Sequence, residues 1–349
     1  MEKILTIVVP TYNMQDYLRR CLDSLIVSEE HMKQLEVLVI NDGSKDNSSA
    51  IAHEYQDKYT DTFRVIDKEN GNYGSCINRG LKEATGKYIK VLDADDWFDT
   101  KSFNEVLEIM SKVDADLFIT DFCEVSVNGT VTKNMSLVGK PKQEVFDFTK
   151  FCVNPFELIP MHFVAYRRDM LIKINYTQSE GISYTDMQWV FLPMAYVKTS
   201  YYAPICLYQY LIGRAGQTMD KSVIKKSIGQ LMKMVDGMID AYNKHCSEFS
   251  NVANDFLIKI ISLQFYKIFM LGLIDKAVDN KVMIEFDKKL KMSNAELYNV
   301  CDNVCFSKTF NLRFIKKWRN SLYRELSFGD LTIIKIVRLL QNLKNRLGI

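Results

Sequence analysis

Three carboxylates lie within four residues at Asp93, Asp95 and Asp96, in the sequence Asp-Ala-Asp-Asp. Like charges this close repel one another unless a cation or a ligand offsets them. Carboxylate oxygens are hard ligands that suit Mg²⁺ or Mn²⁺, and such an ion can neutralise a diphosphate leaving group. The alternative is structural, because acidic residues before Trp97 also suit the N-terminus of a helix.

A second polar cluster has the sequence Asn-Asp-Gly-Ser at residues 41–44. Gly43 permits a tight turn, and the Asp42 carboxylate can accept a hydrogen bond from the N–H of a base such as uracil. A plain turn followed by a helix cap at Ser44 or Asp46 explains the same residues without a ligand.

A third cluster, Pro-Thr-Tyr-Asn at residues 10–13, follows the first apolar segment. The ring of Tyr12 could stack on a base, and an ordinary loop is the alternative. The three clusters are therefore candidates for one nucleotide site, and none of them establishes it alone.

Each cluster follows an apolar segment that fits a strand buried on both faces of a parallel sheet. Helical patterns separate these strands. Because ligands bind outside the carboxyl ends of the strands in such a sheet, we expect the three clusters to converge on one crevice. The predicted strands are Ile4–Val9, Leu35–Ile40, Phe63–Ile66 and Tyr88–Leu92, and the predicted helices are Tyr17–Ile26, Asp46–Tyr59 and Ser75–Ala84.

The last third of the chain has a different pattern. Apolar residues recur at three- and four-residue spacing in the segments Ile224–Asn243 and Asp255–Gly272 and from Leu331 onward, which predicts helices. A length of 349 residues also suggests about two domains. We therefore predict an α/β catalytic domain over 1–219 and a helical region over 220–349.

The order and spacing of the three clusters closely resemble the family 2 glycosyltransferases. Residues 69–80, with the sequence ENGNYGSCINRG, resemble the glycine-rich nucleotide loop of that family and the helix after it. The resemblance is strongest over residues 1–99 and looser as far as Gln217. It implies a GT-A fold, with a Rossmann-like and mostly parallel sheet flanked by helices. It also implies a UDP-sugar donor, inversion at the anomeric carbon, and Mn²⁺ or Mg²⁺ as cofactor.

The resemblance also assigns roles to individual residues. Asp95 would ligate the metal that binds the diphosphate, and Asp93 would lie near the ribose or the metal. The uridine would be held by the loop residues and Asp42, with two residues of the glycine-rich segment close by. The full set implied for the nucleotide-sugar is Pro10, Thr11, Tyr12, Asp42, Gly74, Asn78, Asp93, Ala94 and Asp95.

Three later positions complete the implied site. The segment 182–189 resembles the one that carries the acceptor-activating carboxylate, so Asp186 is the predicted general base, with a helix cap as the alternative. The segment 210–217 resembles a loop of polysaccharide-assembling members, where Arg214 and Gln217 would reach phosphate or acceptor oxygens unless the loop is simply solvated. His162 is a further candidate metal ligand, with a hydrogen-bonded core histidine as the alternative.

Composition excludes several other classes of protein. The chain is 47% hydrophobic and 25% charged with a net charge of +2, which gives no overall bias toward nucleic acid. The eight cysteines form no Cys-x-x-Cys pair, so we expect free and mostly buried thiols. We find no run of 18 to 20 apolar residues and expect a cytoplasmic protein that at most touches the inner face of a membrane.

The C-terminal segment is locally basic. Residues 308–346 contain ten Lys or Arg against Glu325 and Asp330, a net charge of +8. We predict an apolar stripe on the last helix, formed by Ile333, Ile336 or Val337, Leu340, Leu343 and Leu347. Such a helix could lie on an anionic membrane that holds a lipid-linked acceptor, or it could pack against its own domain or a second subunit in a homo-oligomer.

The leading hypothesis is a metal-dependent hexosyl- or N-acetylhexosaminyl-transferase that uses a saccharide or lipid-linked saccharide acceptor in cell-surface polysaccharide synthesis. A nucleotidyltransferase is a second hypothesis, but it would need a glycine-rich triphosphate loop with a Lys or Arg after the first strand. A catalytically degenerate nucleotide-sugar-binding protein is a third. It predicts loss of the carboxylates, yet Asp95, Asp96 and Asp186 are present.

Overall fold

A computed structural model describes residues 2–137, 139, 141–151, 159–214, 226–306 and 312–347, without the side chains of 150, 151 and 341–347. The chain divides into two compact units. The first comprises Met1–Gln217 with Phe249–Ala253, and the second comprises Thr218–Glu248 with Asn254–Ile349. The assignment of catalysis to residues 1–219 stays a prediction.

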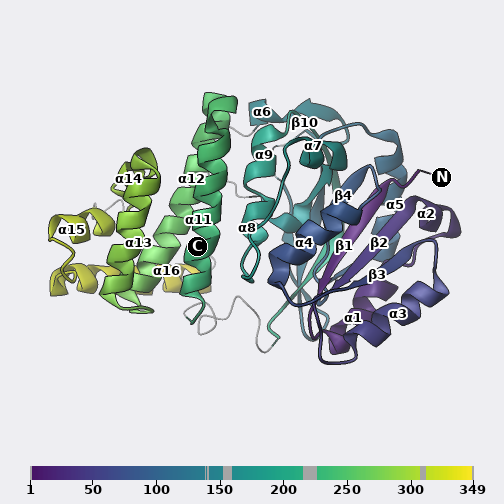
Figure 1. The fold of residues 1–349 in the computed structure, drawn as a ribbon, viewed down its shortest axis with the longest axis horizontal. Helices are drawn as coiled ribbons and strands as arrows, with labels where there is room; N and C mark the ends of the chain where they lie inside the picture. The colour runs from purple at the N-terminus through teal and green to yellow at the C-terminus, as the bar shows by residue number, and fades with distance from the viewer. Residues whose placement is uncertain are drawn as a thin grey trace. The chain divides into compact units, whose positions relative to one another are not determined.

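The first unit is built on a ten-stranded sheet. Eight strands follow the order β3-β2-β1-β4-β9-β6-β10-β5, and the other two pair at the side, β7 with β6 and β8 with β10. Figure 1 shows β3, β2, β1 and β4 side by side in this sheet. The strands are β1 (Leu5–Thr11), β2 (Leu35–Asn41), β3 (Phe63–Asp67), β4 (Tyr88–Val91), β5 (Trp97–Phe98), β6 (Leu117–Ser126), β7 (Val131–Met135), β8 (Val145–Asp147), β9 (Val164–Arg167) and β10 (Thr199–Ile212).

The four predicted strands form the parallel part of this sheet. β1 pairs in parallel with β2 on one side and with β4 on the other, and β2 pairs in parallel with β3. β9 then pairs antiparallel with both β4 and β6, whereas β6 and β10 are parallel. The α/β class is confirmed, and the sheet as a whole is mixed.

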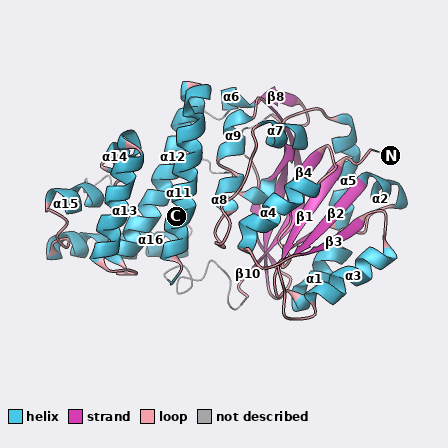
Figure 2. Cartoon of the chain, viewed as in Figure 1, coloured by secondary structure: helices cyan, strands magenta, loops and turns pink. Residues whose placement is uncertain are grey.

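Helices alternate with the strands of the first unit, as predicted (Figure 2). Helix α4 lies against β1 and β2, and close approach requires Gly80, because a Cβ there would lie 2.5 Å from Val8 Cγ1. The helices are α1 (Gln15–Asp23), α2 (Glu29–Gln34), α3 (Ser48–Lys58), α4 (Asn72–Glu83), α5 (Thr100–Lys112), α6 (Phe148–Phe151), the 3₁₀ turn η1 (Met161–Phe163), α7 (Arg168–Lys173), α8 (Asp186–Trp189) and α9 (Leu192–Tyr196).

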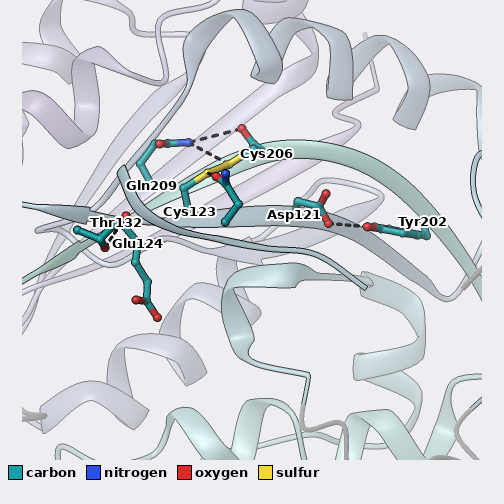
Figure 3. The surroundings of a disulfide bond; sticks show 8 residues. Asp121, Cys123, Glu124, Thr132, Tyr202, Cys206 and Gln209 are labelled. Atoms are coloured by element: carbon teal, nitrogen blue, oxygen red, sulfur yellow. Dashed lines mark hydrogen bonds between the residues drawn. A yellow bond between two sulfur atoms is a disulfide. The ribbon is translucent and has the colours of Figure 1, made fainter. Parts of the chain in front are cut away.

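One expectation about the cysteines was wrong. Cys123 on β6 and Cys206 on β10 form a disulfide with 6.4 Å between their Cα atoms, next to the hydrogen bond from Tyr202 to Asp121 (Figure 3). The two strands are neighbours, and a register shift in β10 around Cys206 brings the two side chains together. The partners are 83 residues apart, so spacing alone could not reveal the pair. Cys21, Cys76 and Cys301 are free and buried thiols, as predicted, and Cys246 is a free thiol that is partly exposed.

The second unit is helical in its described residues, as predicted. Inside it, the buried Arg319 guanidinium pairs with the Asp287 carboxylate at 2.6 Å and with the Asp302 carboxylate at 2.9 Å. The helices are α11 (Ile228–His245), η2 (Cys246–Glu248), α12 (Asn251–Phe269), the π-helix η3 (Met270–Ile274), α13 (Asn280–Ser293), α14 (Ala295–Cys301), α15 (Phe314–Asn320) and α16 (Phe328–Leu347).

One helical stretch, Asn251–Ile274, is long and apolar enough to cross a membrane by length and composition. Its mean hydropathy is 1.7, although polar residues such as Lys259 and Gln264 interrupt the run. Because of these interruptions the stretch contains no continuous run of 18 to 20 apolar residues, so it was not predicted as a membrane span. In its apolar 18-residue window, 56% of the residues are buried, and the core helix of a soluble protein has the same properties, so the stretch is weak evidence for a membrane span.

Candidate active site

The loops after β1 and β2 are joined to each other at the carboxyl edge of the sheet. The Asp42 backbone N–H donates to the Thr11 carbonyl at 2.8 Å, and the Asn13 N–H donates to Ser44 Oγ at 3.0 Å. Thr11 and Asp42 are buried, whereas Tyr12 is 46% exposed. The second and third polar clusters are therefore joined to each other, and Tyr12 is accessible beside the junction.

A third segment, the loop before α4, is fixed to Asp42. The Lys68 ammonium lies 2.5 Å from Asp42 Oδ1, and the Gly71 N–H donates to the same oxygen at 2.9 Å. The Asn70 side chain donates to the Asp42 carbonyl at 2.9 Å. No sequence pattern indicated a role for Lys68, which directly precedes the glycine-rich segment.

Gly74 and Asn78 join α4 to a later part of the chain. A Cβ at Gly74 would lie 2.0 Å from the Ser179 carbonyl oxygen, so only glycine fits there. The Asn78 amide donates to the Gln178 carbonyl at 2.9 Å and to Glu180 Oε1 at 2.8 Å. These contacts place both residues in the support of the site, and direct contact with a nucleotide-sugar stays a prediction for them.

The acidic cluster after β4 is held by two tyrosines. Tyr73 donates its hydroxyl proton to Asp93 Oδ1 at 2.8 Å. Tyr208 donates to Asp96 Oδ2 at 2.7 Å, and the Leu211 N–H donates to Asp96 Oδ1 at 2.8 Å. Neither tyrosine was predicted as a site residue, although Tyr73 lies inside the glycine-rich segment 69–80.

The helix-cap alternative for this cluster does not hold. Helix α5 begins at Thr100, and its N-cap is Asp99, which accepts a hydrogen bond from the Ser102 N–H at 2.8 Å. Asp93, Asp95 and Asp96 precede β5 instead. Their position at the end of β4 therefore has to be explained by the contacts they make in the site.

Electrostatics within the cluster favour binding of a cation. Burial raises the pKa of Asp93 and of Asp96, and the charge of Asp95 adds to both effects. The charge of Asp186 also contributes to raising the pKa of Asp93, so these two carboxylates act on each other electrostatically. Carboxylates that destabilise one another in this way gain most from a divalent ion.

Arg214 follows the end of β10 and contacts the same acidic cluster. Its Nε lies 2.6 Å from Asp95 Oδ2, and both side chains are largely buried. On the other side of the loop, Arg20 donates to the Asp95 carbonyl at 2.9 Å, and Ala94 is buried beside it. Gln217 lies outside the described residues.

His162 in η1 faces the acidic cluster. One ligand atom each of Asp93, Asp96 and His162 lie within 4.8 Å of one another. His162 Nδ1 is buried and has no hydrogen-bond partner among the described residues. Burial and the charge of Lys90 lower the pKa of the imidazole to about 3, so the ring is neutral at pH 7 and keeps a lone pair for a ligand.

These residues fit a divalent ion by their chemistry. Two carboxylates and one neutral imidazole are oxygen and nitrogen donors that suit Mn²⁺, and the unpaired Nδ1 supplies a free donor atom. Lys90 on β4 stabilises η1, because its Nζ donates a hydrogen bond to the His162 carbonyl at 2.7 Å. Asp96 joins the candidate ligands here, although the sequence analysis named only Asp95, Asp93 and His162.

Asp186 opens α8 from a supported position. The Thr185 hydroxyl before it donates to Gln178 Oε1 at 2.9 Å. Trp189 at the end of the same turn is buried, with its ring centroid 5.2 Å from that of Tyr166 and 5.8 Å from that of Tyr176. The N-cap is Thr185 rather than Asp186, so capping does not explain the acidic residue.

Comparison with known proteins defines the class. Residues 6–174 match the family model described as "Glycosyl transferase family 2". The crystal structure of Staphylococcus aureus TarS 1–349 in complex with UDP-GlcNAc shares the fold, with a TM-score of 0.65 at 18% identity over 96% of this chain and 92% of that one. The first unit therefore has a GT-A type fold.

Curated relatives give the same family. The chain is 38% identical to "Uncharacterized glycosyltransferase MG025" of Mycoplasma genitalium over 130 residues, which are 36% of this chain and 42% of the relative. It is 35% identical to "Putative glycosyltransferase EpsH" of Bacillus subtilis over 117 residues, 34% of this chain and 33% of the relative. The matches thus span less than half of those relatives. Residues 6–174, a little under half of this chain, therefore resemble the family 2 glycosyltransferases.

Proposed function

We propose that this protein is an inverting glycosyltransferase that moves a sugar from a UDP-sugar to a hydroxyl of a saccharide or lipid-linked saccharide. The observation that carries the proposal is the meeting of the acidic cluster, Arg214 and His162 at the end of β4. The segment before α4 connects this cluster to Asp42, because Gly71 binds Asp42 and Tyr73 binds Asp93. Following the family resemblance, we place the activity in cell-surface polysaccharide synthesis.

The UDP-sugar donor is supported by two observations. Tyr12 is exposed, and the buried Asp42 lies on a loop that is hydrogen-bonded to the end of β1 at Thr11, which suits stacking on a base and acceptance of its N–H. The TarS structure of the same fold holds UDP-GlcNAc, which favours an N-acetylhexosaminyl group over other sugars. In this proposal Pro10 and Thr11 border the uridine, and Arg214 and Gln217 bind the diphosphate.

Asp95, Asp93 and His162 would hold Mn²⁺ or Mg²⁺, with Asp96 beside them. The ion would neutralise charge that develops on the departing diphosphate. Arg214 supplies further positive charge at the same place through its pair with Asp95. Tyr73 fixes the orientation of Asp93 by its hydrogen bond, so the carboxylate is positioned before a donor binds.

Asp186 is the proposed general base. An inverting transfer needs a hydroxyl oxygen to attack the anomeric carbon on the face opposite the leaving group, and its proton must pass to a nearby base. The Asp186 side chain is exposed on the first residue of α8, so an acceptor can approach it. The carboxylates at 93, 95 and 96 serve the leaving-group side instead.

We also propose a peripheral contact between the second unit and a membrane from the cytoplasmic side. On α16 the side chains of Ile334 and Val337 are buried, whereas Ile336, Leu339 and Leu340 are exposed. The predicted stripe is thus divided, with Val337 facing the core and Ile336 and Leu340 facing outward. Exposed apolar residues beside basic ones suit an anionic lipid surface, and a homo-oligomer contact is the competing explanation.

A donor screen tests the proposal. Purified protein is incubated with UDP- and GDP-sugars, with and without Mn²⁺, and release of nucleoside diphosphate is measured. Mn²⁺-dependent release from a UDP-sugar, most strongly from UDP-GlcNAc, is the expected result. If the folded protein released no nucleoside diphosphate from any of the sugar nucleotides, the proposed reaction would be contradicted.

A further inference from the structure

The two oxygens of the Asp42 carboxylate have different surroundings. Oδ1 accepts the Gly71 N–H at 2.9 Å and the Lys68 ammonium at 2.5 Å, and these are the nitrogen donors that reach this carboxylate from the described part of the chain. A carboxylate oxygen offers about two lone-pair positions, so Oδ1 is filled. The nearby Cys76 thiol is only a weak donor. Oδ2 is therefore the oxygen left for a ligand.

Lys68 is held in place by three contacts. Its Nζ donates to Asp42 Oδ1, to the Ser75 hydroxyl at 2.8 Å and to the Glu69 carbonyl at 2.7 Å. An ammonium has three donors, so all of them are used. The Lys68 side chain is only 18% exposed and is fixed by both the loop and α4. It therefore cannot leave Oδ1 without losing a buried hydrogen bond.

The bases of nucleotides differ in what they present to such a carboxylate. Uracil has one N–H, at N3, between two carbonyl groups, and it needs a single acceptor. Guanine has two adjacent N–H groups, at N1 and at the exocyclic N2, and it needs two acceptors side by side. Cytosine has an unprotonated N3, whose lone pair would face the carboxylate.

We propose that Lys68 makes this pocket selective for uracil. By filling Oδ1 together with Gly71, Lys68 leaves one acceptor oxygen on Asp42, which matches the single N–H of uracil. Guanine bound in the same place would have its second N–H against an oxygen that is already filled. The inference rests on the proposed function, in which Asp42 binds the base of the sugar nucleotide.

The expected size of the effect follows from one unsatisfied buried donor. Leaving one N–H of the bound base without an acceptor weakens nucleotide binding about 5- to 150-fold. Replacing Lys68 by Met keeps most of the aliphatic stem and removes the ammonium, which frees one position on Oδ1. The preference for UDP over GDP should then fall by at least about fivefold. Lys82→Met is the matched control, because Lys82 is an exposed lysine in the last turn of α4.

The test is calorimetric titration of the full chain with UDP, GDP and CDP in the presence of Mn²⁺. We expect wild type and Lys82→Met to prefer UDP over GDP and CDP by at least about fivefold, and Lys68→Met to lose that preference between UDP and GDP. A folded Lys68→Met protein with an unchanged ratio would overturn the inference, as would wild type that binds UDP and GDP equally well.

A second measurement does not depend on the variant. UDP methylated at N3 lacks the N–H, so wild type should bind it at least about fivefold more weakly than UDP. Equal binding of the two compounds would show that Asp42 does not contact the base at this position and would overturn the inference. Failure to bind any of the nucleotides would instead contradict the proposed function itself, and the inference with it.

Discussion

Replacement of Tyr208 by Phe removes a single hydroxyl from the support of the acidic cluster. That hydroxyl donates to Asp96 Oδ2 at 2.7 Å and accepts the Asp93 backbone N–H at 3.2 Å. The ring itself is buried and packs 5.7 Å from the Phe98 ring, so Phe preserves the shape of the core. The change therefore isolates two hydrogen bonds.

The lost hydrogen bond to Asp96 is buried and the one from the Asp93 N–H is partly buried, which sets the magnitude of the loss in stability. A hydrogen bond to a charged group contributes about 1.5 to 3 kcal/mol, and leaving the Asp93 N–H without a partner costs about 1 to 3 kcal/mol. Because the two effects share one hydroxyl and are not additive, we expect a loss of about 2 to 4 kcal/mol in the free energy of unfolding. For a unit of this size the Tm should fall by about 5 to 15 °C.

The assay is thermal unfolding followed by near-UV circular dichroism, with Tyr242→Phe as the control. Tyr242 on α11 is buried, and its hydroxyl has no hydrogen-bond partner within the described residues, so its loss should change stability by less than about 1 kcal/mol. A Tyr208→Phe protein as stable as that control would refute the idea that Tyr208 holds Asp96 in place.

Four further predictions address the chemistry and the second unit. Asp95→Ala should abolish sugar transfer and weaken Mn²⁺-dependent UDP binding, measured by calorimetry. Asp186→Asn should bind UDP normally but transfer sugar at least about a hundredfold more slowly in an assay with acceptor. Folding raises the pKa of Asp93 and Asp96, so the folded protein binds protons at these carboxylates more tightly than the unfolded chain does. The Tm measured without metal should therefore fall as the pH rises from about 4. Added Mn²⁺ should raise the Tm more at pH 8 than at pH 5. Truncation after Asp330 should leave donor hydrolysis intact and reduce sedimentation with anionic vesicles.

The sequence predicted the parallel strands and the loops that follow them because both depend on local patterns. A strand buried on both faces needs a mostly apolar run, and β1 and β2 each contain one, whereas the buried Lys90 interrupts the run in β4. The polar clusters after these strands could then be placed at one edge of the sheet by topology alone. The antiparallel insertion of β9 was not predicted, since only four residues form it and no local pattern fixes its neighbours.

The supporting contacts of the site could not be predicted from the sequence. The Tyr208 hydrogen bond to Asp96 spans 112 residues, and the Arg214 pair with Asp95 spans 119. Neither partner carries a local signal, because a tyrosine in a strand and an arginine in a loop have many uses. The Lys68 contact with Asp42 spans only 26 residues, but it depends on the path of the glycine-rich loop, which the pattern of residues does not determine.

The path of β10 explains how three like charges can be tolerated at the end of β4. This strand runs parallel to β6 and delivers Tyr208, the Leu211 N–H and Arg214 to the acidic loop in succession. The first two bind Asp96, and Arg214 neutralises Asp95. An ion that binds Asp95 must therefore share or displace Arg214, whereas His162 Nδ1 has no partner to lose in the described structure. In the proposed function Arg214 binds the diphosphate, so we expect donor binding to draw Arg214 away from Asp95 and thereby to strengthen ion binding. Ion binding should strengthen donor binding by the same factor, because coupling between two ligands of one site is reciprocal.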